Sequence, residues 1–125
     1  MPVEGSKATM PRGYMMERMR DLKTKEIALP RLNNLAPTLE STTLKLMEEA
    51  GELAQAIGKF RGLSGEQHVM NEGRVVDLIV KELLDVAQTA ISLMFVMEES
   101  YGADVGGSLE RHVQKLIDKG YLKIE

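Results

Sequence analysis

The fold is decided by residues 44–61, with the sequence LKLMEEAGELAQAIGKFR. The stretch contains mostly good helix formers and no proline, and its apolar residues recur at the i, i+3, i+4, i+7 spacing of an amphipathic helix. These apolar residues are Leu46, Met47, Ala50, Leu53, Ala54 and Ile57. The pattern predicts a helix that buries one face against another part of the protein.

Three glutamates, Glu48, Glu49 and Glu52, lie within this predicted helix. At about 100° per residue, Glu49 is expected at the edge of the apolar face, Glu52 about 60° further out, and Glu48 about 40° beyond Glu52. A carboxylate at the rim of a buried face loses water, so it needs a cation or a hydrogen-bond donor. Glu49 and Glu52 are i, i+3 neighbours, roughly 5–6 Å apart at Cβ. They can therefore converge on one ligand.

A second acidic pair, Glu82 and Asp85, lies in a long hydrophobic helix expected over residues 74–101. Its spacing is again i, i+3, and Glu82 is expected at the rim of the apolar surface, as Glu49 is. A short connection between two helices favours antiparallel packing. In that arrangement the two acidic pairs face each other across a groove.

Four carboxylates brought this close repel one another, and a divalent cation would neutralise them. Ligation by oxygen alone favours a hard ion, Mg²⁺ or Mn²⁺, and such an ion screens polyphosphates and activates water. The sequence therefore points to phosphate chemistry. The alternative is that the acidic residues form an ordinary solvated helix face, or meet a basic partner, as in a non-catalytic helical interaction module.

The composition favours a single all-α domain that resembles a four-helix bundle. The chain has 125 residues, of which 43% are hydrophobic and only 4% aromatic, and this suits helices better than a β-sandwich. We expect a flexible leader over residues 1–13 and one helical domain over residues 14–125. The helices are expected over residues 14–28, over residues 39–60 after an N-cap at Thr38, and over residues 74–101 and 108–119.

The charge and the cysteine content limit the partners and the location. The net charge of −3 gives no reason to expect binding to nucleic acid. No apolar run approaches the length of a membrane span, so we expect no membrane association. The absence of cysteine excludes disulfides and is compatible with a reducing cytoplasm, where we expect the protein to act.

Two sequence blocks resemble a known family. Glu49-Ala-Gly-Glu52 followed by Glu82-Leu-Leu-Asp85 is similar to the ExxE…ExxD signature of the MazG-like, all-α nucleoside triphosphate pyrophosphohydrolases. The surrounding segments KLMEEAGELAQAI and KELLDVAQTAI resemble the helices of that family as well, and the resemblance covers roughly residues 38–100.

The resemblance implies an oligomeric helical bundle, a homodimer or homotetramer, that hydrolyses a nucleoside triphosphate between its α and β phosphates with Mg²⁺. It implies that the metal ligands are Glu49, Glu52, Glu82 and Asp85, with Glu48 in a water-orienting role, so that Glu48, Glu49 and Glu52 form the catalytic set. The same helix also resembles phosphoribosyl-ATP pyrophosphatase, which stays open as an alternative.

Three cations are candidates for binding the substrate phosphates. Lys59 and Arg61 lie at the end of the acidic helix, and Lys81 precedes Glu82. Each also has an ordinary explanation, since cations favour helix C-termini and Lys81 can pair with Asp85 along its own helix.

Overall fold

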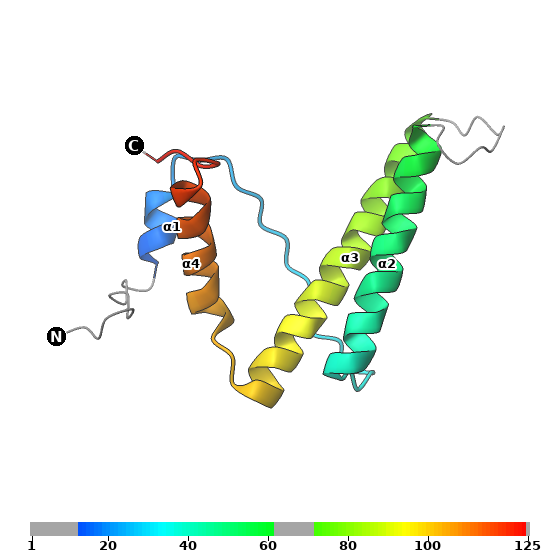
Figure 1. Cartoon of the computed structure of the whole chain (residues 1–125), viewed down its shortest axis with the longest axis horizontal. Helices are drawn as coiled ribbons and strands as arrows, with labels where there is room; N and C mark the ends of the chain where they lie inside the picture. Colours follow the sequence, from blue (N-terminus) through cyan, green and yellow to red (C-terminus); the bar gives the residue numbers. More distant parts are fainter. Residues whose placement is uncertain (1–12, 62–71, 125) are drawn as a thin grey trace. The chain divides into compact units, whose positions relative to one another are not determined.

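A computed structural model describes residues 13–61 and 72–124 (Figure 1). Within these residues the protein is all-helical, with four helices and no strand, which confirms the predicted all-α fold. The helices are α1 (Tyr14–Arg18), α2 (Leu39–Phe60), α3 (Glu72–Tyr101) and α4 (Val105–Asp118). Most of the predicted leader lies outside the described residues. Among the described helices, not one combines the length and the apolar composition needed to cross a membrane.

The chain divides into two compact units. One contains the described parts of Met1–Ile27 and Asp104–Glu125, and the other is Ala28–Ala103, which holds α2 and α3. The single domain over residues 14–125 therefore stays a prediction.

The first unit differs from the sequence-based prediction at both of its helices. The helix expected over residues 14–28 is helical only over Tyr14–Arg18. Of residues 19–28, only Met19 and Leu22 are partly buried, so this stretch has too little buried apolar surface to stabilise a longer helix. The fourth helix starts at Val105 rather than Ser108, because the Asp104 carboxylate accepts a hydrogen bond from the Gly107 N–H at 3.0 Å and caps it.

The boundaries of α2 and the end of α3 follow the prediction. Thr38 caps α2: its hydroxyl accepts a hydrogen bond from the Ser41 N–H at 3.1 Å, and the Thr38 N–H donates to the Ser41 hydroxyl at 3.0 Å. At the end of α3, Gly102 has a φ of +68°, a left-handed conformation that glycine adopts without strain.

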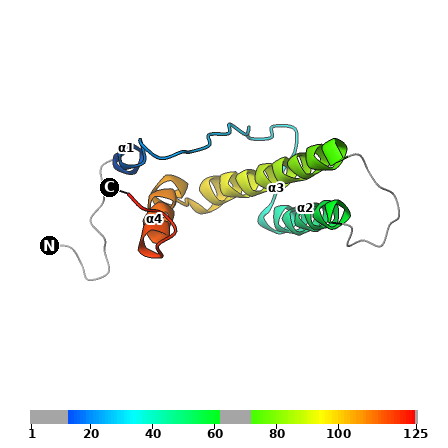
Figure 2. The same cartoon turned by 90° about the horizontal axis from the view of Figure 1, so that it is seen from above.

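The helices α2 and α3 pack side by side and run antiparallel, as both views show (Figures 1 and 2). Their buried positions recur every seven residues, as in a coiled-coil seam. The buried residues are Thr42, Glu49 and Ala56 on α2, and Val75, Glu82, Thr89, Ser92 and Val96 on α3, of which all but Ser92 follow the seven-residue repeat. Glu49 therefore lies in the middle of the buried face, not at its edge as predicted.

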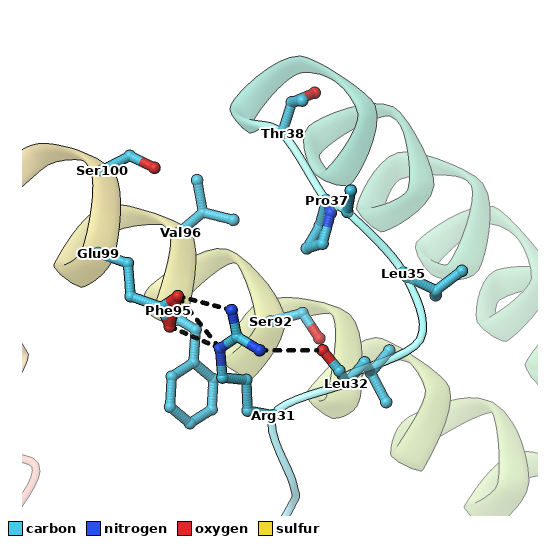
Figure 3. A pocket seen from close by; sticks show the side chains of 11 residues that line it. Arg31, Leu32, Leu35, Pro37, Thr38, Ser92, Phe95, Val96, Glu99 and Ser100 are labelled. Atoms are coloured by element: carbon cyan, nitrogen blue, oxygen red, sulfur yellow. Dashed lines mark hydrogen bonds and ion pairs between the residues drawn. The ribbon is translucent and has the colours of Figure 1, made fainter.

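An extended segment leads from Ala28 to the N-cap of α2 and is held to α3 at two points. The Gln88 amide donates a hydrogen bond to the Pro30 carbonyl at 2.9 Å. The Arg31 guanidinium donates to both carboxylate oxygens of Glu99, with the two shortest bonds at 2.7 Å (Figure 3). These contacts place the segment beside the seam between α2 and α3.

Candidate metal centre and adjoining cavity

The antiparallel seam brings three of the four predicted acidic ligands together. Glu49 of α2 and Glu82 and Asp85 of α3 each offer one carboxylate oxygen, and these three atoms lie within 4.8 Å of one another. Because the ligand atoms come from both helices and are all carboxylate oxygens, the cluster suits a hard divalent cation.

Two of the three carboxylates in this cluster are buried, whereas acidic side chains are usually exposed to solvent. Glu49 and Glu82 are each only 7% exposed. One oxygen of each, Oε2, is buried and has no hydrogen-bond partner among the described residues. Burying a carboxylate oxygen without a partner is costly, and two negative charges facing each other add repulsion. A bound cation would remove both penalties, so the residues present fit a metal ion.

Two lysines neutralise part of the cluster. Lys45 Nζ lies 3.1 Å from Glu49 Oε1, and Lys81 Nζ lies 3.0 Å from Asp85 Oδ2 and 3.5 Å from Glu82 Oε1. The hydrogen bonds to Glu49 and to Asp85 are the main reason that the pKa values of Lys45 and Lys81 are raised. Lys81, predicted to bind substrate, therefore pairs with the acidic residues of its own helix.

The other two predicted glutamates are exposed. The pKa of Glu52 is raised, first by the negative charge of Glu49, then by partial loss of water and by the charge of Glu82. The negative charges of the cluster therefore act on Glu52, although Glu52 is not one of the three residues whose oxygens lie within 4.8 Å of one another. Glu48 lies beside the cluster, with Oε2 at 3.6 Å from Lys45 Nζ.

Lys59 and Arg61 lie away from the cluster. They are exposed at the end of α2, ten and twelve residues beyond Glu49, which corresponds to roughly 15 to 18 Å along the helix axis. The Arg61 guanidinium lies 5.1 Å from the centre of the Phe60 ring. The structure does not bring these two cations to the carboxylates, and their role in substrate binding stays a prediction.

A cavity of about 460 Å³ adjoins the cluster on the side toward the N-terminus of α2. Lys45, Glu49 and Asp85 line it at the acidic end. Its other walls combine hydroxyl and amide side chains from the two helices with apolar side chains of the extended segment. They are Ser41, Thr42, Gln88, Thr89 and Ser92, and Leu32, Leu35, Ala36 and Pro37. A hollow of about 410 Å³ shares Leu32, Leu35, Ala36, Pro37 and Ser92 with it and extends past Phe95 and Glu99 (Figure 3).

Sequence reasoning missed three features of this site. The first is the ion pair between Lys45 and Glu49, which their i, i+4 spacing could have revealed. The second is that Thr42 and Glu49 share the buried face of α2, which their seven-residue spacing could have revealed. By contrast, the pairing of Arg31 with Glu99 joins residues 68 positions apart, and no local pattern indicates it.

The comparisons with known proteins agree with this geometry. The family model described as the MazG nucleotide pyrophosphohydrolase domain matches residues 37–120, about two thirds of the chain. This match includes all the acidic residues of the candidate centre. Searches among curated proteins and among solved structures found no match. The chain belongs to the MazG nucleotide pyrophosphohydrolase family.

Proposed function

We propose that the protein hydrolyses a nucleoside or deoxynucleoside triphosphate between the α and β phosphates, giving the monophosphate and pyrophosphate in a Mg²⁺-dependent reaction. The proposal is carried by one buried oxygen each of Glu49 and Glu82, which have no hydrogen-bond partner among the described residues and lie next to a cavity large enough for a nucleoside. Membership of the MazG family supports the reaction class.

The residues have distinct roles in this proposal. Glu49, Glu52, Glu82 and Asp85 would hold Mg²⁺, with Mn²⁺ as a substitute. When bound, the ion supplies positive charge against the polyphosphate and acidifies a water molecule. The exposed carboxylate of Glu48 lies beside the cluster, where it can orient the attacking water and accept its proton. Lys45 and Lys81, which pair with the acids, would be released to the substrate phosphates as the cation takes their place.

The exposed apolar surface supports a homodimer or homotetramer. The buried apolar side chains among the described residues are few: Met15, Ala56, Val75, Val96 and Val113. On α3, Val76, Val80 and Leu83 are exposed and recur at i, i+4, i+7, which is the spacing of a helix–helix seam. Contiguous apolar surface of this kind commonly marks a protein interface. We propose that a second copy of the chain covers it.

The cellular role follows from the reaction. An enzyme that destroys nucleoside triphosphates serves house-cleaning or control of nucleotide pools. We propose that it acts in the cytoplasm, where its substrates are found.

Two measurements test the proposal together. Hydrolysis of all common nucleotides is followed with Mg²⁺ and with EDTA, and Mg²⁺ binding is followed by calorimetry in the wild type and in Glu52→Gln and Asp85→Asn. We expect metal-dependent turnover of at least one nucleotide, and loss of turnover in both variants with their helical circular dichroism unchanged. Wild-type rates in either folded variant would contradict the assignment. Turnover of phosphoribosyl-ATP alone would favour phosphoribosyl-ATP pyrophosphatase, and absence of both turnover and Mg²⁺ uptake would favour the interaction module.

A further inference from the structure

The cavity beside the carboxylates is lined by the hydroxyl-bearing side chain of Thr42. Thr42 is only 5% exposed, lines the cavity, and its Oγ1 has no hydrogen-bond partner among the described residues. A buried hydroxyl without a partner is destabilising, so it is seldom found unless something else uses it.

Neighbouring threonines show that a local partner is normally available. Within a helix, a threonine hydroxyl can donate to the carbonyl four residues earlier. Thr43 does this to Leu39 at 2.6 Å, and Thr89 does it to Asp85 at 2.8 Å. Thr42 makes no such bond, although it sits in the same regular helix. Its hydroxyl is therefore held at the cavity wall without being tied to its own backbone.

The register of the two helices places this hydroxyl relative to the acids. Glu49 faces Glu82, and a step of seven residues from each, in opposite directions along the chain, leads to Thr42 and Thr89. Both threonines are buried and line the cavity. A layer of hydroxyl groups thus lies next to the layer of carboxylates, roughly 10 Å along the helix axis. One elongated site has an anionic end, which suits a metal ion that could in turn hold phosphates, and a neutral polar end.

We infer that the neutral end of this cavity holds the nucleoside of the substrate and that Thr42 is a specificity-determining residue that hydrogen-bonds to it. The inference rests on the proposed function. A nucleoside triphosphate whose phosphates were held by a cation at Glu49 and Glu82 would extend its uncharged part along the seam toward Thr42. The apolar side chains of Leu32, Leu35 and Pro37 also line this cavity and suit the face of a sugar or base.

The test uses variants of the full chain and ligands that the enzyme does not cleave. Thr42→Val removes the hydroxyl and keeps the shape, Thr42→Ser keeps the hydroxyl, and Thr43→Val is the matched control on the exposed side of α2. Binding is measured by calorimetry with Mg²⁺ for the α,β-methylene analogues of the common nucleoside and deoxynucleoside triphosphates, and for inorganic tripolyphosphate. Unfolding midpoints without ligand are recorded for every variant.

The expected result is selective. Thr42→Val weakens the tightest-binding analogue by about 3- to 10-fold, the loss of one neutral hydrogen bond, and leaves tripolyphosphate within twofold. Thr42→Ser and Thr43→Val bind both ligands as the wild type does. The unfolding midpoint of Thr42→Val is unchanged or higher, because the variant buries no partnerless hydroxyl.

The contrary results separate this inference from the proposed function. Unchanged analogue binding in Thr42→Val, or an equal loss for tripolyphosphate, overturns the assignment of Thr42 even if the wild type hydrolyses nucleotides. Failure of the folded wild type to bind any analogue overturns the nucleoside assignment of the cavity. Because binding is measured without turnover, a wild type that binds the analogues but cleaves no nucleotide refutes only the proposed reaction.

Discussion

The variant Glu82→Gln should distinguish the effect of the buried acidic cluster on stability from its effect on metal binding and turnover. The carboxylate oxygens of Glu49 and Glu82 lie within 4.8 Å of each other. At that separation, two unit charges repel by about 3 kcal/mol with an effective dielectric constant near 20. Lys45 and Lys81 offset part of this repulsion. The new amide can also donate a hydrogen bond to a neighbouring carboxylate oxygen. We expect Glu82→Gln to raise the free energy of unfolding by about 1 kcal/mol in EDTA.

Magnesium should reverse this order of stability. An ion that binds only the folded wild type adds about 2.7 kcal/mol at a concentration of 100 times its Kd. The variant has lost one ligand charge and should gain little. Its Mg²⁺-dependent turnover should fall by about 100-fold or more, since even the partners of metal ligands are often worth 10- to 100-fold.

The assay is denaturant unfolding followed by circular dichroism, in EDTA and in Mg²⁺, with turnover measured on the same samples. Glu98→Gln is the control, because Glu98 is an exposed acid on the same helix. It should change neither the effect of Mg²⁺ on stability nor the turnover. A Glu82→Gln protein that is less stable than the wild type in EDTA, or that keeps both its stabilisation by Mg²⁺ and its turnover, would contradict a metal site at Glu82.

Thr38→Ala removes the hydroxyl that caps α2 and should cost about 1 kcal/mol, seen as a drop of roughly 3 to 6 °C in the unfolding midpoint; an unchanged midpoint would argue against the cap. The hydrogen bonds from Arg31 lower the pKa of Glu99 below its ordinary 4.5. This pair therefore stabilises the fold above pH 4.5, and its contribution is lost as the pH falls through the lowered pKa. Glu99→Gln should thus melt below the wild type at pH 7, and the difference should shrink in acid; a constant difference in melts from pH 7 to pH 3 would count against the ion pair. Val80→Glu places a charge on the exposed apolar face of α3 and should shift the sedimentation coefficient from an oligomer toward a monomer, and an unshifted oligomer would show that the interface lies elsewhere.

Periodicity and end signals were sufficient to predict much of the second unit. The range of α2, its cap at Thr38 and the end of α3 at Gly102 are confirmed. The antiparallel packing that was expected of the two helices brings Glu49 to Glu82 and Asp85. Local spacing carries this information because helix geometry is nearly the same in every protein.

Other features depend on contacts that no local pattern encodes. The apolar arc predicted for α2 included Met47 and Ile57, yet these are 68% and 43% exposed, while Glu49 is buried. The buried face is determined by the position of α3, so part of the predicted apolar face, at Met47 and Ile57, is exposed in the part of the chain that the structure describes. The first helix is shorter than predicted because of residues 19–28 only Met19 and Leu22 are partly buried.

The most direct test of the central claim is to identify which phosphorus atom is attacked. The best substrate of the hydrolysis screen is cleaved with Mg²⁺ in water enriched in ¹⁸O, and the products are analysed by ³¹P NMR and mass spectrometry. We predict pyrophosphate and a nucleoside monophosphate, with the label in the monophosphate. Release of orthophosphate, or label in pyrophosphate, would contradict cleavage by attack at the α phosphorus.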